Sequence, residues 1–191
     1  MKTVPPEEAA AALRAGKVAL VPTETVVGLV AAESGLARVR EIKGREADKP
    51  IALLCSSVEE AFALAENVPP LARRLAELYW PGPLTLVLDL PGGGTIGVRV
   101  PAGNSVQELL AAYGGPLYAT SANLSGEGDS GSVESVDQRV LSEVDVLVEG
   151  EAGSGVASAV VDLSAGRTWL LRATRDLPED RLRQLADQLS H

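Results

Sequence analysis

Residues 18–25 read Val18-Ala19-Leu20-Val21-Pro22-Thr23-Glu24-Thr25, and this stretch decides the fold class. Four consecutive apolar residues predict a short buried strand, which ends at the proline because proline has no amide hydrogen for a sheet. Open α/β sheets bind ligands beyond the carboxyl ends of such strands, so Thr23-Glu24-Thr25 is a candidate ligand wall. A turn that ends in a helix cap is an equally good interpretation, since threonine caps helices well.

Helical patterns and short apolar runs alternate along the rest of the chain. Two capping-box patterns, at Ser57 and at Ser105, each predict the start of a helix. The runs 84–88 and 96–100 flank three consecutive glycines and predict an antiparallel hairpin. We therefore expect a mixed α/β sheet in one domain over residues 1–191. The expected helices are 6–15, 35–42, 57–67, 70–79, 105–113 and 178–189, and the further strands are 50–54, 117–120, 144–148, 159–163 and 169–171.

Composition excludes several kinds of chemistry. The chain has 191 residues, one cysteine (Cys55) and one histidine, which is the last residue, His191. An internal disulfide is impossible, and a usual zinc site or a histidine-dependent triad is not expected. No apolar run reaches the length of a membrane span and the start lacks a signal-peptide pattern, so we expect a cytoplasmic protein without a membrane partner. The formal net charge of −9 counts against broad attraction to nucleic acid but allows a local basic cleft.

Two polar signatures suggest a site for an anionic ligand such as a nucleotide. Lys43 and Arg45 are two residues apart, so on extended backbone they would point the same way and grip phosphate or carboxylate oxygens. Two cations near a helix end more often serve only the helix dipole. Ser121 and Asn123 follow an apolar run and could bond a ribose, a base edge or a phosphate, or form an ordinary polar turn.

A third feature is Arg99, a charged residue inside the apolar run 96–100. Burying a guanidinium is costly without a counter-charge, which would come from a ligand carboxylate or from a nearby Asp or Glu. Asp129 and Ser130 lie in a glycine- and serine-rich segment over 126–132, for which we expect a flexible loop. These two residues could approach a magnesium ion, although an acidic residue in a mobile loop more often has no special role.

Six short segments, each modest by itself, follow one another along the chain. They are 21–29 (VPTETVVGL), 42–50 (IKGREADKP), 80–85 (WPGPLT), 98–101 (VRVP), 121–126 (SANLSG) and 155–162 (GVASAVVD). In this order and spacing they resemble the YrdC-like family, the threonylcarbamoyl-adenylate synthases, over nearly the whole chain. The resemblance implies a twisted mixed α/β sheet with flanking helices around a deep, positively charged cavity. It also implies the short, single-domain form, which works with separate partner proteins.

The implied activity is that of a nucleotidyltransferase. It joins L-threonine, bicarbonate and ATP into threonylcarbamoyl-AMP and releases pyrophosphate, and the product feeds t6A modification of tRNA at adenosine 37. Magnesium is expected to come with the nucleotide, and no protein metal site is expected. The residues carried over by the resemblance are Lys43 and Arg45 as catalytic phosphate-binding groups, Ser121, Asn123, Ser130 and Arg172 for the rest of ATP, and Thr23, Arg99 and Ser158 for L-threonine.

The chain departs from the family pattern at several positions, and two other functions stay open. Val27 replaces a usual tyrosine, which should remove an aromatic wall and weaken threonine binding, while Ala157 and Ala159 flank Ser158 in place of Glu and Thr. A related synthase acting on another amine is therefore one alternative. The other is a non-catalytic module on the same fold that binds double-stranded RNA or tRNA. The acidic net charge and few aromatic residues argue against RNA as the main ligand.

Overall fold

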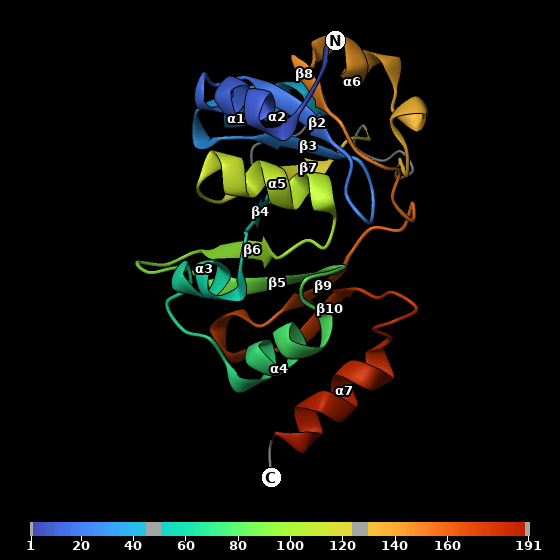
Figure 1. The fold of residues 1–191 in the computed structure, drawn as a ribbon. Coiled ribbons are helices and arrows are strands. Elements are labelled where there is room, and N and C mark those ends of the chain that lie inside the picture. The colour runs from blue at the N-terminus through green and yellow to red at the C-terminus, as the bar shows by residue number, and fades with distance from the viewer. Residues whose placement is uncertain (1, 45–50, 124–129, 190–191) are drawn as a thin grey trace.

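The computed structural model describes residues 2–44, 51–123 and 130–189, which fold around one mixed sheet of ten strands (Figure 1). The spatial order is β1-β8-β2-β3-β7-β4-β6-β5-β9-β10. The expected mixed α/β sheet is confirmed. The strands are β1 (Lys2–Val4), β2 (Val18–Val21), β3 (Gly28–Ala31), β4 (Ala52–Leu54), β5 (Leu84–Asp89), β6 (Thr95–Arg99), β7 (Leu117–Ser121), β8 (Val146–Val148), β9 (Ala159–Asp162) and β10 (Trp169–Arg172).

Seven α-helices flank this sheet in the described residues. Those around β2, β3 and β8 are α1, α2, α5 and α6, while α3, α4 and α7 lie toward the other end of the sheet (Figure 1). None of them is long and apolar enough to cross a membrane. Their bounds are α1 (Pro6–Arg14), α2 (Leu36–Lys43), α3 (Val58–Ala63), α4 (Pro70–Tyr79), α5 (Asn104–Tyr113), α6 (Gln138–Glu143) and α7 (Glu179–Gln188), with short 3-10 turns at Glu33–Gly35, Val133–Ser135 and Ser164–Gly166.

Most expected elements are present, and the exceptions have local causes. The helix that opens at Ser57 ends at Ala63, earlier than expected. The capping box at Ser105 is wrong, because α5 already starts at Asn104 with Gly103 as its N-cap. Two strands, β1 and β3, were not expected. The first is only three residues long, and the second follows the polar turn after β2 so closely that it does not stand out as a separate run.

Sheet pairing joins distant parts of the chain. β2 pairs antiparallel with β3, from Val18 opposite Ala31 to Val21 opposite Gly28, so the polar group that follows β2 lies in the connecting turn. The expected hairpin is confirmed by the antiparallel pairing of β5 with β6. β9 then adds in parallel to β5, and β10 adds antiparallel to β9 at the sheet edge.

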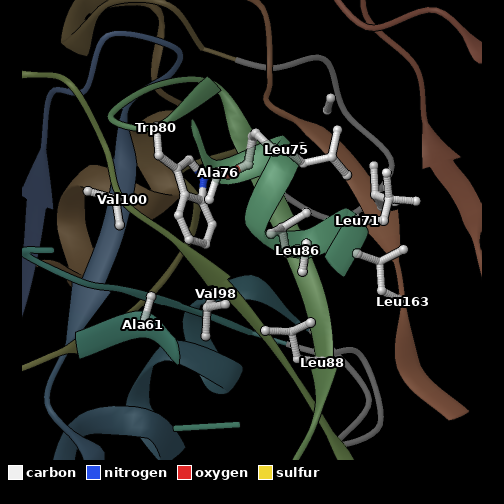
Figure 2. Packing of buried hydrophobic residues seen from close by; sticks show 14 of the residues in the cluster. Ala61, Leu71, Leu75, Ala76, Trp80, Leu86, Leu88, Val98, Val100 and Leu163 are labelled. Atoms are coloured by element: carbon white, nitrogen blue, oxygen red, sulfur yellow. Dashed lines mark hydrogen bonds between the residues drawn. The ribbon is translucent and has the colours of Figure 1, made fainter. Parts of the chain in front are cut away.

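Alternation along β5, β6 and β9 gives this part of the sheet two different faces. Leu84, Leu86 and Leu88 of β5 are almost fully buried in a core that also takes Val98 of β6 and Val161 of β9. Figure 2 shows part of this core, in which side chains of β5 and β6 meet Trp80 and two leucines of α4, Leu71 and Leu75. Because side chains of a strand alternate between faces, the intervening residues project to the opposite side. Those residues make the floor of the pocket described next.

Candidate functional site

A pocket of about 410 Å³ lies over the middle strands of the sheet. Its floor is made of short or polar side chains at the alternate positions of β5, β6 and β9, and its walls come from the turn after β2, from the end of β7 and from β10. Most of these side chains reach only a short distance from the backbone, so the sheet face stays open here. The lining residues are Thr23, Thr25, Val26, Ala52, Leu54, Thr85, Val87, Thr95, Gly97, Arg99, Ala119, Thr120, Ser121, Ala157, Ser158, Val160, Asp162, Leu171 and Arg172.

Gly97 keeps the centre of this floor low. A Cβ at this position would lie 3.3 Å from Cγ2 of Thr85 and 3.4 Å from Cβ of Ala52, on neighbouring strands. Any side chain at residue 97 would therefore crowd its neighbours and fill space that a ligand could use. Glycine weakens the interior of a strand, and it is found there mainly at positions where a neighbouring backbone or a ligand comes close.

The turn after β2 holds its threonines in a directed chain of hydrogen bonds. Thr23 Oγ1 donates to the carbonyl oxygen of Val26 (2.7 Å) and lies 2.9 Å from Thr25 Oγ1. A hydroxyl has one proton, so Thr25 is the donor between the two threonines. The backbone N–H of Thr25 also donates to Thr23 Oγ1, at 3.2 Å. The Thr23 hydroxyl is thus engaged within its own turn, and its position on the pocket wall is fixed.

A glycine-rich strap, residues 150–155, covers the outer side of this turn. The amides of Ser154 and Gly155 donate to the carbonyl oxygens of Glu24 (3.0 Å) and Thr25 (2.7 Å). A Cβ on Gly153 would lie 2.3 Å from the Thr23 oxygen, closer than real atoms approach. The strap can therefore lie flat against the turn only with glycine at this position.

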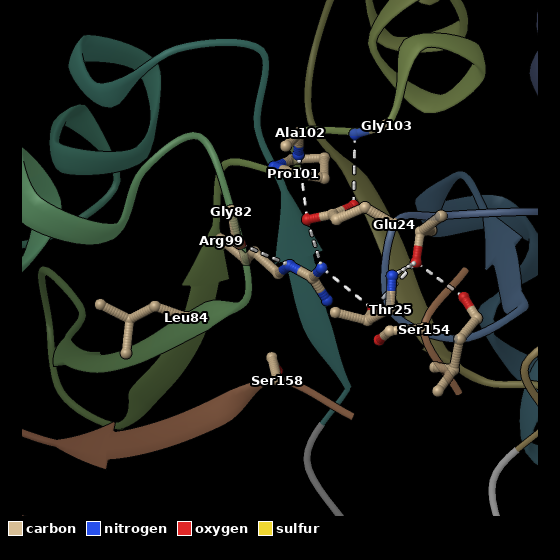
Figure 3. A network of polar contacts seen from close by, with 12 residues as sticks. Glu24, Thr25, Gly82, Leu84, Arg99, Pro101, Ala102, Gly103, Ser154 and Ser158 are labelled. Atoms are coloured by element: carbon tan, nitrogen blue, oxygen red, sulfur yellow. Dashed lines mark hydrogen bonds and ion pairs between the residues drawn. The ribbon is translucent and has the colours of Figure 1, made fainter. Parts of the chain in front are cut away.

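Arg99 is buried at the end of β6 and lines the pocket. Its Nε donates to the carbonyl oxygen of Gly82 (3.1 Å), and its Nη2 donates to Glu24 Oε1 (2.7 Å) and to Thr25 Oγ1 (3.0 Å) (Figure 3). Of the two counter-charges considered from sequence, the neighbouring acid is present, and it is Glu24. No hydrogen bond joins Nη1 of Arg99 to any described residue. A side chain with a fixed guanidinium plane and one uncommitted terminal nitrogen is suited to binding a carboxylate or phosphate oxygen.

The carboxylate of Glu24 accepts three hydrogen bonds from described residues, and Glu24 does not line the pocket. Besides Arg99, the amides of Ala102 (3.0 Å) and Gly103 (3.2 Å) donate to its two oxygens (Figure 3). Burial by itself would raise the pKa of this carboxyl, but the Arg99 charge and the hydrogen bonds outweigh it and hold the pKa below the ordinary value. Glu24 is therefore an anion that links the turn after β2 to the segment after β6.

Ser158 and Thr85 form a buried hydroxyl pair on the floor, 2.9 Å apart. The pair uses one hydroxyl proton between its members, so the other proton is available to a bound molecule. Arg172 of β10 donates through Nε to the carbonyl oxygen of Ser158 (2.6 Å). The structure thus brings Ser158 and Arg172 together in the same pocket as Thr23 and Arg99.

Lys43 is the last residue of α2, followed by Gly44 with a left-handed φ of 57°. The extended-backbone arrangement expected around it is therefore wrong. Its side chain is 2% exposed, and its ammonium donates to the carbonyl oxygens of Ser121 (2.6 Å) and Asn123 and to Asn123 Oδ1 (3.1 Å). Ser121 Oγ also donates to Asn123 Oδ1. The lysine and the serine-asparagine segment form one cluster, of which only Ser121 lines the pocket.

The remaining expected site residues lie elsewhere or outside the described ranges. Arg45 and Asp129 fall outside the described residues. Ser130 is buried, donates through Oγ to the Ser135 carbonyl oxygen (3.1 Å) and does not line the pocket. Val27 is fully buried in a core cluster with Leu20 and is not part of the pocket wall.

The charged residues of the lining are two arginines, Arg99 and Arg172, and one acid, Asp162. Asp162 Oδ1 accepts hydrogen bonds from the amide and hydroxyl of Ser164. The described residues hold no cluster of three Asp, Glu, His or Cys side chains that could bind a metal. A second cavity, of about 480 Å³, lies between β10 and α7. It contains none of the expected site residues, so the pocket over the middle strands is the candidate site.

Sequence reasoning missed Thr85 and Asp162 as parts of this site, and it missed the pairing of Glu24 with Arg99. The signal for Thr85 and Asp162 was present, because each is a polar residue in a strand that is otherwise mostly apolar. Glu24 belongs to the polar turn that was predicted as a ligand wall. Nothing local in the sequence identified Arg99 as its partner, 75 residues away.

A mixed sheet of this order, with a buried arginine lining a pocket on its middle strands, defines an α/β protein with a pocket suited to an anionic group. Residues 11–174 match the family model Sua5/YciO/YrdC, described as "Telomere recombination". The chain belongs to this family. Its resemblance to the YrdC-like proteins is thereby confirmed.

Relatives with known names agree with this assignment. The chain is 38% identical over 177 residues to the threonylcarbamoyl-AMP synthase of Pyrococcus abyssi, covering 86% of this chain and 52% of the relative. It is 34% identical to the threonylcarbamoyl-AMP synthase of Stenotrophomonas maltophilia, covering 80% of this chain and 90% of the relative. A crystal structure of P. abyssi Sua5 complexed with L-threonine superimposes with a TM-score of 0.86 at 34% identity, over 96% of this chain and 60% of that one. The chain thus spans about half the length of the Pyrococcus relative.

Proposed function

We propose that this chain is a threonylcarbamoyl-AMP synthase, which forms threonylcarbamoyl-AMP and pyrophosphate from L-threonine, bicarbonate and ATP. The observation that carries the proposal is the pocket with Nη1 of Arg99, which bonds to none of the described residues, in a chain that matches, over nearly its whole length, the fold of a Sua5 protein complexed with L-threonine. The similarity to named synthases supports the same activity, and no comparable support exists for the RNA-binding alternative.

In this proposal the threonine end of the pocket is built around Arg99. Its Nη1 hydrogen-bonds the carboxylate of L-threonine, because the other donors of the guanidinium are already held by Gly82, Glu24 and Thr25. Thr23 shapes the wall beside the carboxylate, with its hydroxyl engaged in the turn. The hydroxyl pair of Ser158 and Thr85 supplies a polar contact on the floor.

The nucleotide end is proposed to lie toward Ser121 and Arg172. Lys43 fixes Ser121 and Asn123 through its ammonium and adds positive charge beneath them. Arg172 brings a guanidinium to the opposite wall. Arg45 and Ser130 are assigned to the ATP site by the family resemblance.

The reaction needs no protein nucleophile under this proposal. Carbamoylated threonine attacks the α-phosphate of ATP, its oxygen forms the new P–O bond, and pyrophosphate leaves. Catalysis then consists of positioning and of stabilising negative charge by fixed cations. Magnesium enters bound to ATP phosphates, in keeping with a pocket that offers Asp162 as its single carboxylate among the described residues.

Release of pyrophosphate tests the proposal directly. The wild-type protein, incubated with ATP and magnesium, should release pyrophosphate only when L-threonine and bicarbonate are both present. Arg99→Ala should lower the rate at subsaturating L-threonine by about 100-fold or more, by analogy with the removal of one electrostatic stabiliser. The matched control is Arg74→Ala, which removes an exposed arginine of α4 that pairs with Glu77 of the same helix.

Pyrophosphate release that does not depend on L-threonine would overturn the assignment of substrate. Dependence on a different amine would favour a related synthase instead. Binding of a tRNA to the wild-type protein with no release of pyrophosphate under any of these conditions would favour the RNA-binding alternative. We also expect threonylcarbamoyl-AMP made by this protein to support t6A formation when a tRNA and the partner proteins of the pathway are supplied.

A further inference from the structure

Glu24 holds a central place in the site without reaching the pocket. Its carboxylate receives the Nη2 donor of Arg99 and the Ala102 amide on one oxygen and the Gly103 amide on the other. Glu24 is absent from the pocket lining, whereas Arg99 is part of it. The carboxylate thus lies between the Arg99 guanidinium and the amides of Ala102 and Gly103 (Figure 3).

The consequence for Arg99 is a fixed orientation. An arginine side chain has several rotatable bonds, and holding it in one geometry costs conformational entropy. Here Nε is bound by the Gly82 oxygen, and Nη2 is bound by Glu24 and Thr25. Of these partners only Glu24 carries a charge, and bonds between ionised groups are about twice as strong as neutral ones. The plane of the guanidinium, and with it the direction of Nη1, therefore depends most on Glu24.

Glu24 also fixes the backbone that follows Arg99. Ala102 and Gly103 are three and four residues beyond the arginine, and Gly103 is the N-cap of α5. One carboxylate therefore ties the turn after β2, the end of β6 and the start of α5 together. A Cβ on Gly103 would lie 3.2 Å from the Glu24 amide nitrogen, so the two segments are in close contact.

We infer that Glu24 is a positioning residue for the amino-acid substrate, acting through Arg99 by holding Nη1 in the direction of the substrate carboxylate. This inference rests on the proposed function, since it takes L-threonine as the bound carboxylate. A positioning role and a purely electrostatic role of Glu24 predict opposite changes in substrate affinity when its charge is removed. A negative charge beside Arg99 weakens the attraction of a second carboxylate, so its removal would strengthen binding if charge alone decided the outcome.

The variant Glu24→Gln separates these two effects. Glutamine keeps the length of the side chain but has only one acceptor oxygen, and its NH2 group must face either the Gly103 amide or the pair formed by Arg99 and Ala102. In at least one of these contacts the glutamine NH2 group then faces another hydrogen-bond donor. The charge that orients the guanidinium is also lost. Positioning predicts that the dissociation constant for L-threonine rises by about 10- to 100-fold, the range expected for a misplaced binding group.

The experiment measures L-threonine binding by calorimetry and, with ATP and bicarbonate, the KM for each substrate from pyrophosphate release. In Glu24→Gln the KM for L-threonine should rise while the KM for ATP changes by less than about twofold. Glu24→Asp, which keeps the charge, should recover part of the affinity. Glu108→Gln is the matched control, because it removes the same charge from an exposed position on α5. Circular dichroism and the fluorescence of buried Trp80 establish that each variant is folded.

A second comparison tests whether Glu24 acts through Arg99. In an Arg99→Ala background, Glu24→Gln should lower kcat/KM for L-threonine by less than about twofold, because the group that it positions is gone. An equal loss in both backgrounds would overturn the inference, as would unchanged or tighter L-threonine binding by folded Glu24→Gln. A wild-type protein that neither binds L-threonine nor releases pyrophosphate with it would instead overturn the proposed function, and this inference with it.

Discussion

Replacing Lys43 by methionine tests how the serine-asparagine segment is held. Methionine keeps an unbranched apolar stem of similar length, so the change removes little besides the ammonium. That ammonium donates to two carbonyl oxygens and one side-chain oxygen in a site that is 2% exposed. A hydrogen bond to a charged group contributes about 1.5–3 kcal/mol, and partial entry of water will offset some of the loss.

We therefore expect the free energy of unfolding to fall by about 3 kcal/mol in Lys43→Met. For a chain of this size, such a loss corresponds to a decrease in melting temperature of about 6–12 °C. Urea denaturation followed by tryptophan fluorescence measures it, because Trp80 is buried in the core. The matched control is Lys17→Met, an exposed lysine, for which we expect a change within about 0.5 kcal/mol. A Lys43→Met protein as stable as this control would refute the reasoning, since it would mean that the ammonium contributes nothing to the cluster.

Three further predictions concern the strap, the thiol and the turn after β2. Gly153→Ala places a methyl group 2.3 Å from the Thr23 oxygen, so we expect a loss of about 1–3 kcal/mol in urea denaturation together with weaker L-threonine binding. Burial, with a smaller effect from the Glu60 charge, raises the pKa of Cys55 to about 12, so a thiol reagent at pH 8 should modify the native protein far more slowly than the unfolded chain. The pKa of Glu24 is lowered on folding, so its contribution to stability is present above the unfolded carboxyl pKa and is lost as the pH falls through the folded value. The difference in melting temperature between wild type and Glu24→Gln should therefore narrow from pH 6.5 to pH 3.5, an interval on either side of the unfolded value of about 4.3.

Each of these predictions has a clear contrary result. Gly115→Ala is the control for the strap, since a Cβ there meets nothing closer than 4.0 Å, and equal stability of the two alanine variants would contradict the packing argument. Rapid stoichiometric labelling of Cys55 in native protein would show that the thiol is accessible. A difference in melting temperature that is constant or grows toward pH 3.5 would show that the Glu24 carboxylate is not stabilised in the folded state.

The sequence predicted much of the fold because the signals for its elements are local. β2 begins and ends at the expected residues, since an apolar run stops at Pro22. α4 also has its expected bounds, between Pro70 and Tyr79, because prolines lie at both of its ends. The hairpin of β5 and β6 follows from its glycine turn. The order of the strands could not be predicted, because pairs such as Lys2 with Val146 join residues far apart in the chain without any local pattern.

The contrast between local signals and long-range contacts also explains which parts of the site could be predicted. A charged residue in an apolar strand marked Arg99 as functional, but its charge partner could have been any acidic residue or a ligand. Only the folded structure identifies Glu24 as the partner. In the sheet β3, β7 and β4 separate β2 from β6, and the turn after β2 brings the Glu24 carboxylate to Arg99. Lys43 was expected to bind the phosphates of ATP, and this role stays a prediction. Its burial against Ser121 and Asn123 depends on where α2 ends relative to β7, and no local rule fixes that distance.

The pocket draws its walls from Thr23, near the beginning of the chain, and from Arg172, close to its end. During synthesis, no incomplete chain that lacks β10 can enclose a ligand in the same way. A molecule that fits this space therefore meets its full set of contacts only after β10 has joined the sheet. By mass action it would shift the balance toward the fully folded form, with a stabilisation that grows as its concentration exceeds its dissociation constant.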